Sequence, residues 1–267
     1  MDLVDYHTHT TLSPDSTITL DVLCQTAIGL GLREVCVTDH WNLVSQEGEV
    51  TLVPFPWQSS LEQWTAARER YASRLELRLG LEVGNGLLDD GLVVQTLSLP
   101  QLDFAIGSIH NLSETYDRQG AYTLAHRVST RDEGVALLND YMESLLALSR
   151  TDGFDVMGHI IYPLRYLPPA LGLTLEPWRD TLAQLLRNLI QAGKGIEFNT
   201  KGGVVEDYAG LLELYRDLGG QILTFGSDAH RANRLADRLA DAYALAREKG
   251  FQYYTVYRNR KPCFRPL

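Results

Sequence analysis

The sequence has few cysteines and no segment that would direct it to a membrane. Its three cysteines, Cys24, Cys36 and Cys263, are odd in number, and no two of them have the C-x-x-C spacing of a zinc or redox motif. This usage argues against a disulfide framework and is typical of reduced thiols. No apolar run approaches the roughly 18 residues of a transmembrane helix, and the first residues lack the basic stretch and apolar core of a secretion signal. We therefore predict a cytoplasmic protein with no membrane partner.

Positive charge is also scarce. The chain has 24 Lys and Arg against 34 Asp and Glu, a net charge of −10. Such a balance disfavours extended binding to nucleic acid. It does not exclude a small anionic substrate, because bound metal ions can reverse the local field. We find no repeat, low-complexity tract or long linker in the 267 residues, so we expect one domain over 1–267.

Short apolar runs alternate with amphipathic stretches along the chain. Strand-like runs cover Leu3–Thr8, Glu34–Thr38, Leu77–Val83, Phe104–Ile109, Asp155–His159, Gly195–Asn199, Ile222–Gly226 and Tyr253–Tyr257. Helical patterns cover Thr19–Leu30, Ser60–Arg74, Arg131–Arg150, Leu175–Gln191, Glu206–Leu218 and Asn233–Lys249. This alternation predicts an α/β fold with a parallel sheet. At this length it favours a closed or distorted TIM-like barrel, in which the carboxyl ends of the strands converge on one mouth.

Six of the seven histidines lie at or just after the end of a predicted strand, and carboxylates accompany most of them. The candidate ligands at these positions are His7, His9, His40, Glu82, His110, His159, Asp228 and His230. Imidazole nitrogens and carboxylate oxygens are the usual ligands of borderline divalent metals. The pattern therefore predicts a multinuclear metal site. The seventh histidine, His126, follows no strand signal and is not expected to be a ligand.

Single motifs in this set have ordinary structural explanations. His7 and His9 face the same way on a strand, where two inward histidines can also serve packing or hydrogen bonding. Asp15, in Ser-Pro-Asp-Ser, has common turn chemistry. Asp39 should point away from its neighbour on an extended strand, and we favour a supporting role for it. Glu197 is a candidate ligand, a partner of a ligand or a surface residue.

Taken in order, these motifs resemble those of the PHP (polymerase and histidinol phosphatase) superfamily. They are Asp-Tyr-His7-Thr-His9, the Asp15 loop, Val-Thr-Asp39-His40, Glu82, Ser-Ile-His110, Gly-His159 and Ser-Asp228-Ala-His230. The opening segment is most similar to the monofunctional histidinol-phosphate phosphatases of that superfamily. The resemblance implies a distorted (β/α)7 barrel of the PHP type with a trinuclear metal site.

The resemblance also implies a ligand scheme. One ion would be held by His7, His9, Glu82 and Asp228. Glu82 would bridge to a second ion held by His110 and His159, and a third ion would be held by Asp15, His40 and His230. Relatives often have histidine in place of Asp15, and an oxygen ligand there is compatible with zinc, manganese or iron. We expect two to three divalent ions.

Clustered divalent ions suit phosphomonoester hydrolysis, because they lower the pKa of a bound water and bind the oxygens of a phosphoryl group. The leaving alcohol needs a proton, for which Asp228 and His230 are candidate donors. Arg165 is predicted to cross the barrel mouth and bind the phosphate, although an exposed surface arginine is the alternative. Lys201 and Arg231 are weaker candidates for the same task.

The resemblance favours hydrolysis of L-histidinol phosphate in histidine biosynthesis as the activity. Glu114 and Asp117 are candidates for binding its amine, and Trp41 and Tyr162 for bordering its imidazole, although all four have ordinary surface or packing explanations. The alternatives are another small phosphate monoester, a nucleotide, a phosphotyrosine peptide, a nuclease-like PHP module, and a metal-binding module without catalysis. The acidic composition disfavours the nuclease.

Overall fold

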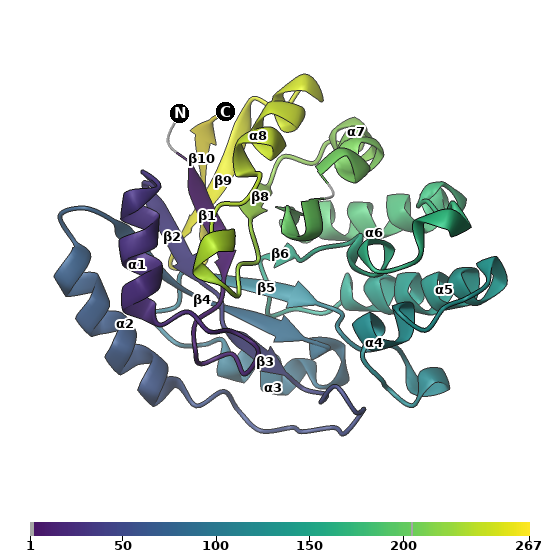
Figure 1. Cartoon of the computed structure of the whole chain (residues 1–267), viewed down its shortest axis with the longest axis horizontal. Coiled ribbons are helices and arrows are strands. Elements are labelled where there is room, and N and C mark those ends of the chain that lie inside the picture. The colour runs from purple at the N-terminus through teal and green to yellow at the C-terminus, as the bar shows by residue number, and fades with distance from the viewer. Residues whose placement is uncertain (1–2, 204) are drawn as a thin grey trace.

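The strands of a mostly parallel sheet wrap into a nearly closed barrel in the computed structural model, which describes residues 3–203 and 205–267 (Figure 1). The sheet order is β1 (Val4–Thr8), β2 (Glu34–Val37), β4 (Glu76–Gly84), β5 (Phe104–Ser108), β6 (Val156–Met157), β7 (Gly195–Asn199) and β8 (Leu223–Gly226). These neighbours pair in parallel, and the short β3 (His40–Asn42) pairs with the end of β4. The predicted α/β barrel is confirmed.

The barrel closes between its first and last strands at their carboxyl ends. An isolated parallel bridge joins Thr8 at the end of β1 to Ala229 just beyond β8. The Asp228 N–H donates to the His7 carbonyl oxygen at 2.8 Å, and the His9 N–H donates to the Ala229 carbonyl oxygen at 3.0 Å. Closure therefore brings Asp228 beside the two histidines of the first motif.

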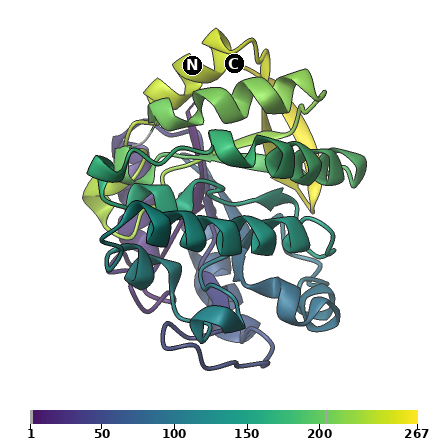
Figure 2. The same cartoon turned by 90° about the vertical axis from the view of Figure 1, so that its right-hand side faces the viewer.

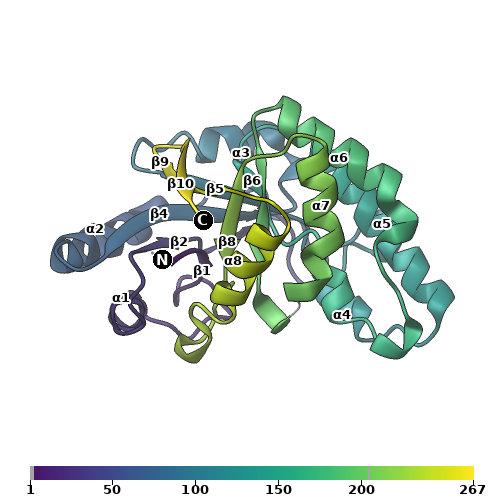
Figure 3. The same cartoon turned by 90° about the horizontal axis from the view of Figure 1, so that it is seen from above.

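The helices pack around the outside of the barrel (Figures 1 and 2). They are α1 (Leu20–Gly29), α2 (Trp57–Tyr71), α3 (Asp90–Thr96), α4 (Ala121–Ala125), α5 (Arg131–Leu148), α6 (Arg179–Gln191), α7 (Ala209–Asp217) and α8 (Leu239–Glu248). Figure 3 shows α5, α6 and α7 side by side along one flank. None of the helices formed by the described residues combines the length and hydropathy of a membrane span.

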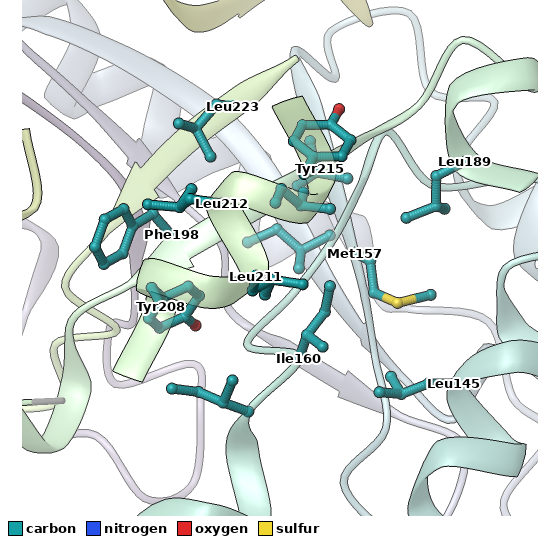
Figure 4. Close-up of a cluster of buried hydrophobic side chains, with 14 of the residues drawn as sticks. Leu145, Met157, Ile160, Leu189, Phe198, Tyr208, Leu211, Leu212, Tyr215 and Leu223 are labelled. Carbon is teal, nitrogen blue, oxygen red and sulfur yellow. The ribbon is translucent and has the colours of Figure 1, made fainter. Parts of the chain in front are cut away.

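A buried core between the barrel and this flank fixes the orientation of β7 (Figure 4). Phe198 points out of the barrel and stacks on Tyr208, with ring centroids 4.5 Å apart, while Leu212 packs in the same cluster. Because side chains alternate along a strand, Glu197 and Asn199 then face the barrel interior. The packing of the outer face thus determines which polar residues reach the site.

Two predicted strands differ from the structure. The predicted strand Asp155–His159 is reduced to Val156–Met157, so His159 lies in the loop that follows. The last predicted strand, now β9 (Tyr253–Arg258), is not part of the barrel but forms an antiparallel hairpin with β10 (Lys261–Pro266). β10 contains two prolines, so its sequence does not predict a strand. An edge strand tolerates proline.

The hairpin covers the amino-terminal end of the barrel by binding one buried carboxylate, Glu34, which is 0% exposed. Arg258 donates to both Glu34 oxygens, Nη1 to Oε1 at 2.5 Å and Nη2 to Oε2 at 2.8 Å. Arg265, Arg78 and the Tyr6 hydroxyl also contact this carboxylate. Burial alone would raise the pKa of Glu34, but Arg258 and Tyr6 outweigh it, so the pKa is lowered.

We expect Glu34→Gln to destabilise the fold by about 3 kcal/mol at pH 7, because it removes the fully buried carboxylate that pairs with three partly buried arginines. The matched control is Glu76→Gln, whose carboxylate is 40% exposed and contacts Arg78 and Arg258; it should cost less than about 1 kcal/mol. The measurement is chemical denaturation of the metal-free protein.

The pH dependence of the Glu34→Gln effect follows from the lowered pKa of Glu34. The contribution is fully present above the unfolded pKa of about 4.3 and is lost as the pH falls through the lower folded pKa. The difference in unfolding free energy between the wild type and Glu34→Gln should therefore become smaller only at acidic pH. Equal costs for the two glutamine variants would contradict a special role for Glu34.

Candidate metal centre

Glu82, near the carboxyl end of β4, is the centre of the histidine cluster. Its carboxylate is 0% exposed and lies close to nitrogens of five histidines. The distances are 3.1 Å from Oε2 to His7 Nε2, 3.6 Å to His9 Nε2 and 2.7 Å to His40 Nδ1, and 3.1 Å from Oε1 to His110 Nε2 and 2.9 Å to His159 Nε2. The structure therefore gathers side chains from distant parts of the sequence around one carboxylate.

Asp228 completes a first group with His7, His9 and Glu82. Its Oδ1 lies 3.8 Å from His7 Nε2 and 3.3 Å from His9 Nε2. Two ligand atoms bound tetrahedrally to zinc at 2.0–2.2 Å are about 3.4 Å apart. The spacing in this group is that of donor atoms around a single divalent ion.

Two further groups show similar spacing. His110 Nε2 and His159 Nε2 are 3.3 Å apart, and each lies near Glu82 Oε1. In the other group, His40 Nε2 is 3.2 Å from His230 Nε2. Asp15 Oδ1 lies 3.7 Å from His40 Nε2, and Asp15 Oδ2 lies 3.2 Å from His230 Nε2. The nine predicted ligands are thus brought into three adjacent groups.

The first group also contains polar atoms that the rest of the chain leaves unsatisfied. Among the described residues, His7 Nε2, His9 Nε2 and Glu82 Oε2 are buried without a hydrogen-bond partner. Buried polar atoms normally have a hydrogen-bond partner, so three neighbouring atoms without one indicate that a ligand binds between them. A divalent cation fits this set of nitrogen and oxygen donors. The residues of this cluster can therefore hold divalent metal.

The acid groups of the cluster favour their charged forms. Burial would raise the pKa of Glu82, but His7, His110 and His40 outweigh it and the pKa lies well below the ordinary range. The pKa of Asp228 is likewise lowered, because Lys201 and His7 outweigh its burial. Both residues are thus carboxylates at neutral pH.

The pKa of His9 is lowered by burial and by neighbouring His40, so its imidazole is neutral at pH 7. Metals bind neutral imidazole. The charge state of His9 therefore suits a metal ligand.

Two of the histidine rings, those of His7 and His110, are oriented by neighbours on the side away from Glu82. The Glu197 carboxylate lies 2.6 Å from His7 Nδ1 and accepts the backbone N–H of His159 at 2.9 Å. Asn42 Oδ1 lies 2.8 Å from His110 Nδ1. Such partners fix the ring orientation of metal-binding histidines. Of the three options for Glu197, the structure supports the partner of a ligand.

Sequence reasoning did not single out Asn42. Its position two residues after His40, on the same face of a strand, is a signal that could have identified it.

Two cations lie beside Asp228. The Arg165 side chain is only 1% exposed, and its Nη1 is 4.0 Å from Asp228 Oδ2. Its Nη2 donates to Asn199 Oδ1 at 2.8 Å, while Nε and Nη1 have no hydrogen-bond partner in the described part of the chain. Lys201 Nζ is 3.0 Å from Asp228 Oδ1. Arg165 is therefore not an exposed surface residue, and Lys201 lies at the cluster.

Several other candidates lie outside the cluster or are used elsewhere. Trp41 is 6% exposed and donates its Nε1–H to the Val53 carbonyl oxygen, so it serves packing. His126 and Arg231 are exposed, and His126 packs on Tyr122 with ring centroids 4.4 Å apart. Exposed Glu114 pairs with Arg118, and Asp117 ends the same short turn of 3-10 helix. By contrast, Tyr162 packs against His159 with ring centroids 4.7 Å apart and borders the cluster.

Comparisons with known proteins place this geometry in a family. A profile of the PHP domain matches residues 5–201. A probable histidinol-phosphatase of Deinococcus radiodurans is 30% identical, over 97% of this chain and 98% of the relative. A histidinol-phosphatase of Lactococcus lactis is 25% identical, over 98% of this chain and 96% of the relative.

A solved structure shares the fold of the whole chain. It is the crystal structure of the histidinol phosphate phosphatase of Lactococcus lactis with zinc, L-histidinol and phosphate, and it has a TM-score of 0.86 at 24% identity. The match covers 98% of this chain and 99% of that chain. At this identity the likeness supports the α/β barrel fold alone.

We expect divalent metal to stabilise the native protein, by about 2.7 kcal/mol at a free concentration 100 times its Kd. Glu82→Gln should remove most of this gain, because it takes the shared carboxylate from two of the three groups. His126→Gln, a histidine outside the cluster, should keep the full gain. Thermal unfolding with and without Zn²⁺ or Mn²⁺ measures the effect, and a wild-type response in Glu82→Gln would contradict the central position of this residue.

Proposed function

The chain belongs to the PHP domain family, and we propose that it is a metal-dependent phosphomonoesterase that hydrolyses L-histidinol phosphate to L-histidinol and phosphate. The observation that carries the reaction class is the convergence of three donor groups around buried Glu82, with the partly unsatisfied guanidinium of Arg165 beside them. The histidinol-phosphatases aligned over nearly the whole chain support the substrate. The reaction belongs to histidine biosynthesis.

Each group is assigned one divalent ion, zinc, manganese or iron. The ligands are His7, His9, Glu82 and Asp228 in the first group, Glu82, His110 and His159 in the second, and Asp15, His40 and His230 in the third. When bound, such ions lower the pKa of water and neutralise charge on phosphoryl oxygens. Everything else in the reaction depends on how the chain's own residues bind, orient and move protons.

Arg165 binds the phosphoryl group. Its guanidinium is held by Asn199 through Nη2, which leaves the N–H groups of Nε and Nη1 without a partner in the described chain and available to donate to phosphate oxygens. Burial excludes water from this contact, so the charge acts at low dielectric as negative charge spreads in the transition state. Lys201, a third of whose side chain is exposed, adds a second positive charge on the same side of Asp228.

Asp228 is the better suited of the two candidates for moving a proton. Its carboxylate is ionised, and Oδ2 is not the oxygen that faces His7 and His9, so Oδ2 is available to accept a proton from the attacking water and return it to the leaving alcohol. His230 is less suited, because Nδ1 lies 2.9 Å from the Asp228 carbonyl oxygen and Nε2 belongs to the third donor group. We therefore assign His230 to metal binding.

The proposed function predicts a clear preference among phosphomonoesters. With equal metal loading, kcat/KM for L-histidinol phosphate should exceed that for p-nitrophenyl phosphate, nucleotides and phosphotyrosine peptides. Contacts to the amine and imidazole supply transition-state binding that generic esters cannot use. Steady-state kinetics on the four substrate classes checks this. Faster turnover of a nucleotide or a phosphopeptide would overturn the substrate and leave the phosphoesterase site intact.

Arg165→Ala should lose about 2–4 kcal/mol of transition-state stabilisation, measured as a fall in kcat/KM at unchanged metal content. Arg165→Lys should recover part of the lost stabilisation, because lysine keeps the positive charge but lacks the planar guanidinium with its several N–H donors. Arg231→Ala, an exposed arginine of the loop after β8, should behave as wild type. Near-normal kcat/KM in fully metallated Arg165→Ala would exclude the phosphate role.

A further inference from the structure

The loop after β1, which carries Asp15, is fastened to the buried carboxylate of Asp39. Asp39 Oδ1 accepts the Thr10 N–H at 2.6 Å and the Ser13 hydroxyl at 2.7 Å, and Oδ2 accepts the Thr10 hydroxyl at 2.8 Å. Ser13 is 0% exposed and Asp39 is 2% exposed. The supporting role predicted for Asp39 thus has identifiable partners.

The Ser13 hydroxyl has two further contacts, both to candidate ligands. The backbone N–H of His40 donates to Ser13 Oγ at 3.0 Å, and His9 Nδ1 lies 3.1 Å from the same oxygen. A serine hydroxyl offers one proton and two lone pairs. The three neighbours of Ser13 Oγ therefore match its full hydrogen-bonding capacity.

Counting the protons fixes the direction of every bond in this chain. An ionised carboxylate only accepts, so the single Ser13 proton must point to Asp39. A backbone N–H only donates, so His40 occupies one lone pair of Ser13. The remaining lone pair can only accept, which requires a proton on His9 Nδ1. With Nδ1 committed to Ser13, the nitrogen of His9 that remains for a metal is Nε2, the atom that faces Asp228 Oδ1 at 3.3 Å and Glu82 Oε2 at 3.6 Å.

His9 differs in this respect from other histidines of the cluster. Nδ1 of His7 lies beside a carboxylate oxygen, Nδ1 of His110 beside a side-chain amide oxygen, and Nδ1 of His230 beside a backbone carbonyl oxygen. Carboxylate and carbonyl oxygens accept without ambiguity. A hydroxyl can donate or accept, so the partner of His9 would not by itself select a tautomer. Asp39 removes that ambiguity.

We propose that Ser13 and Asp39 are positioning residues that hold His9 in the tautomer with a proton on Nδ1 and a free Nε2. The inference rests on the metal site of the proposed function, but not on the substrate. Through the same hydroxyl, Ser13 also anchors the backbone of His40, a candidate ligand of the neighbouring group. One side chain therefore supports ligands of two adjacent metal groups.

The test measures the His9 tautomer and metal affinity, without substrate. In ¹⁵N-histidine-labelled, metal-free protein, at a pH at which the spectrum shows a singly protonated His9, long-range ¹H–¹⁵N NMR should show the proton on Nδ1 and none on Nε2. Ser13→Ala should convert His9 to a mixture of tautomers. In a chelator competition, its Kd for Zn²⁺ at the group that contains His9 should rise about 10–100-fold, as for other lost partners of metal-binding histidines.

Two variants separate positioning from a general effect on the loop. Asp39→Asn keeps an Oδ1 that the Thr10 N–H holds in place, so Ser13 still donates to it and the His9 tautomer and Kd should stay close to wild type. Thr11→Ala changes an exposed residue of the same loop and should change neither quantity. A wild-type His9 protonated on Nε2, or an unchanged Kd in folded Ser13→Ala, would overturn the proposal. A different preferred substrate would not affect it.

Discussion

Burial of the Glu82 carboxylate is the constraint on which the rest of the site depends. A carboxylate removed from water is strongly destabilised unless opposite charge or hydrogen-bond donors surround it. Ser108 donates one hydrogen bond to it at 2.7 Å, and the remaining neighbours are nitrogens of five histidines. Burial lowers the pKa of His7 and His40, but the neighbouring carboxylates outweigh it and raise both pKa values, so these two imidazoles supply positive charge when no metal is bound. A divalent ion would replace those protons, because metals bind neutral imidazole. A cluster of buried carboxylates and imidazoles with unsatisfied atoms is an arrangement that divalent cations complete.

Glu34 is another fully buried glutamate of the barrel, and its surroundings differ from those of Glu82. At the amino-terminal end, Glu34 is satisfied within the chain by Arg258 and Arg265 of the terminal hairpin and by Arg78. At the carboxyl-terminal end, Glu82 is surrounded by groups that leave it incomplete. The first arrangement stabilises the fold. The second leaves buried polar atoms that a bound cation would satisfy. Active sites of such barrels lie at this end.

Much of this could be predicted from the sequence, because the relevant signals are local. Alternating apolar runs indicated the barrel, and histidines at the ends of those runs indicated where side chains converge. Other features depend on contacts that no local pattern records. The β9–β10 hairpin pairs across a turn and carries Pro262, and its function as a cover follows from Glu34, more than 200 positions earlier. The sequence around Lys201 is also typical of a surface charge, and only the fold shows that its side chain lies beside Asp228. Ser13 has the sequence pattern of a turn residue, although its hydroxyl contacts His9 on one segment and the consecutive residues Asp39 and His40 on another.

The central claim is that Glu82 joins two metal groups of one cluster, and anomalous diffraction from crystals of the zinc-loaded protein tests it most directly. The account predicts at least two ions, one on each side of the Glu82 carboxylate, with ligand atoms at about 2.0–2.3 Å. The first ion should contact His7, His9 and Asp228, and the second should contact His110 and His159. A single ion, or ions bound away from Glu82, would contradict the account.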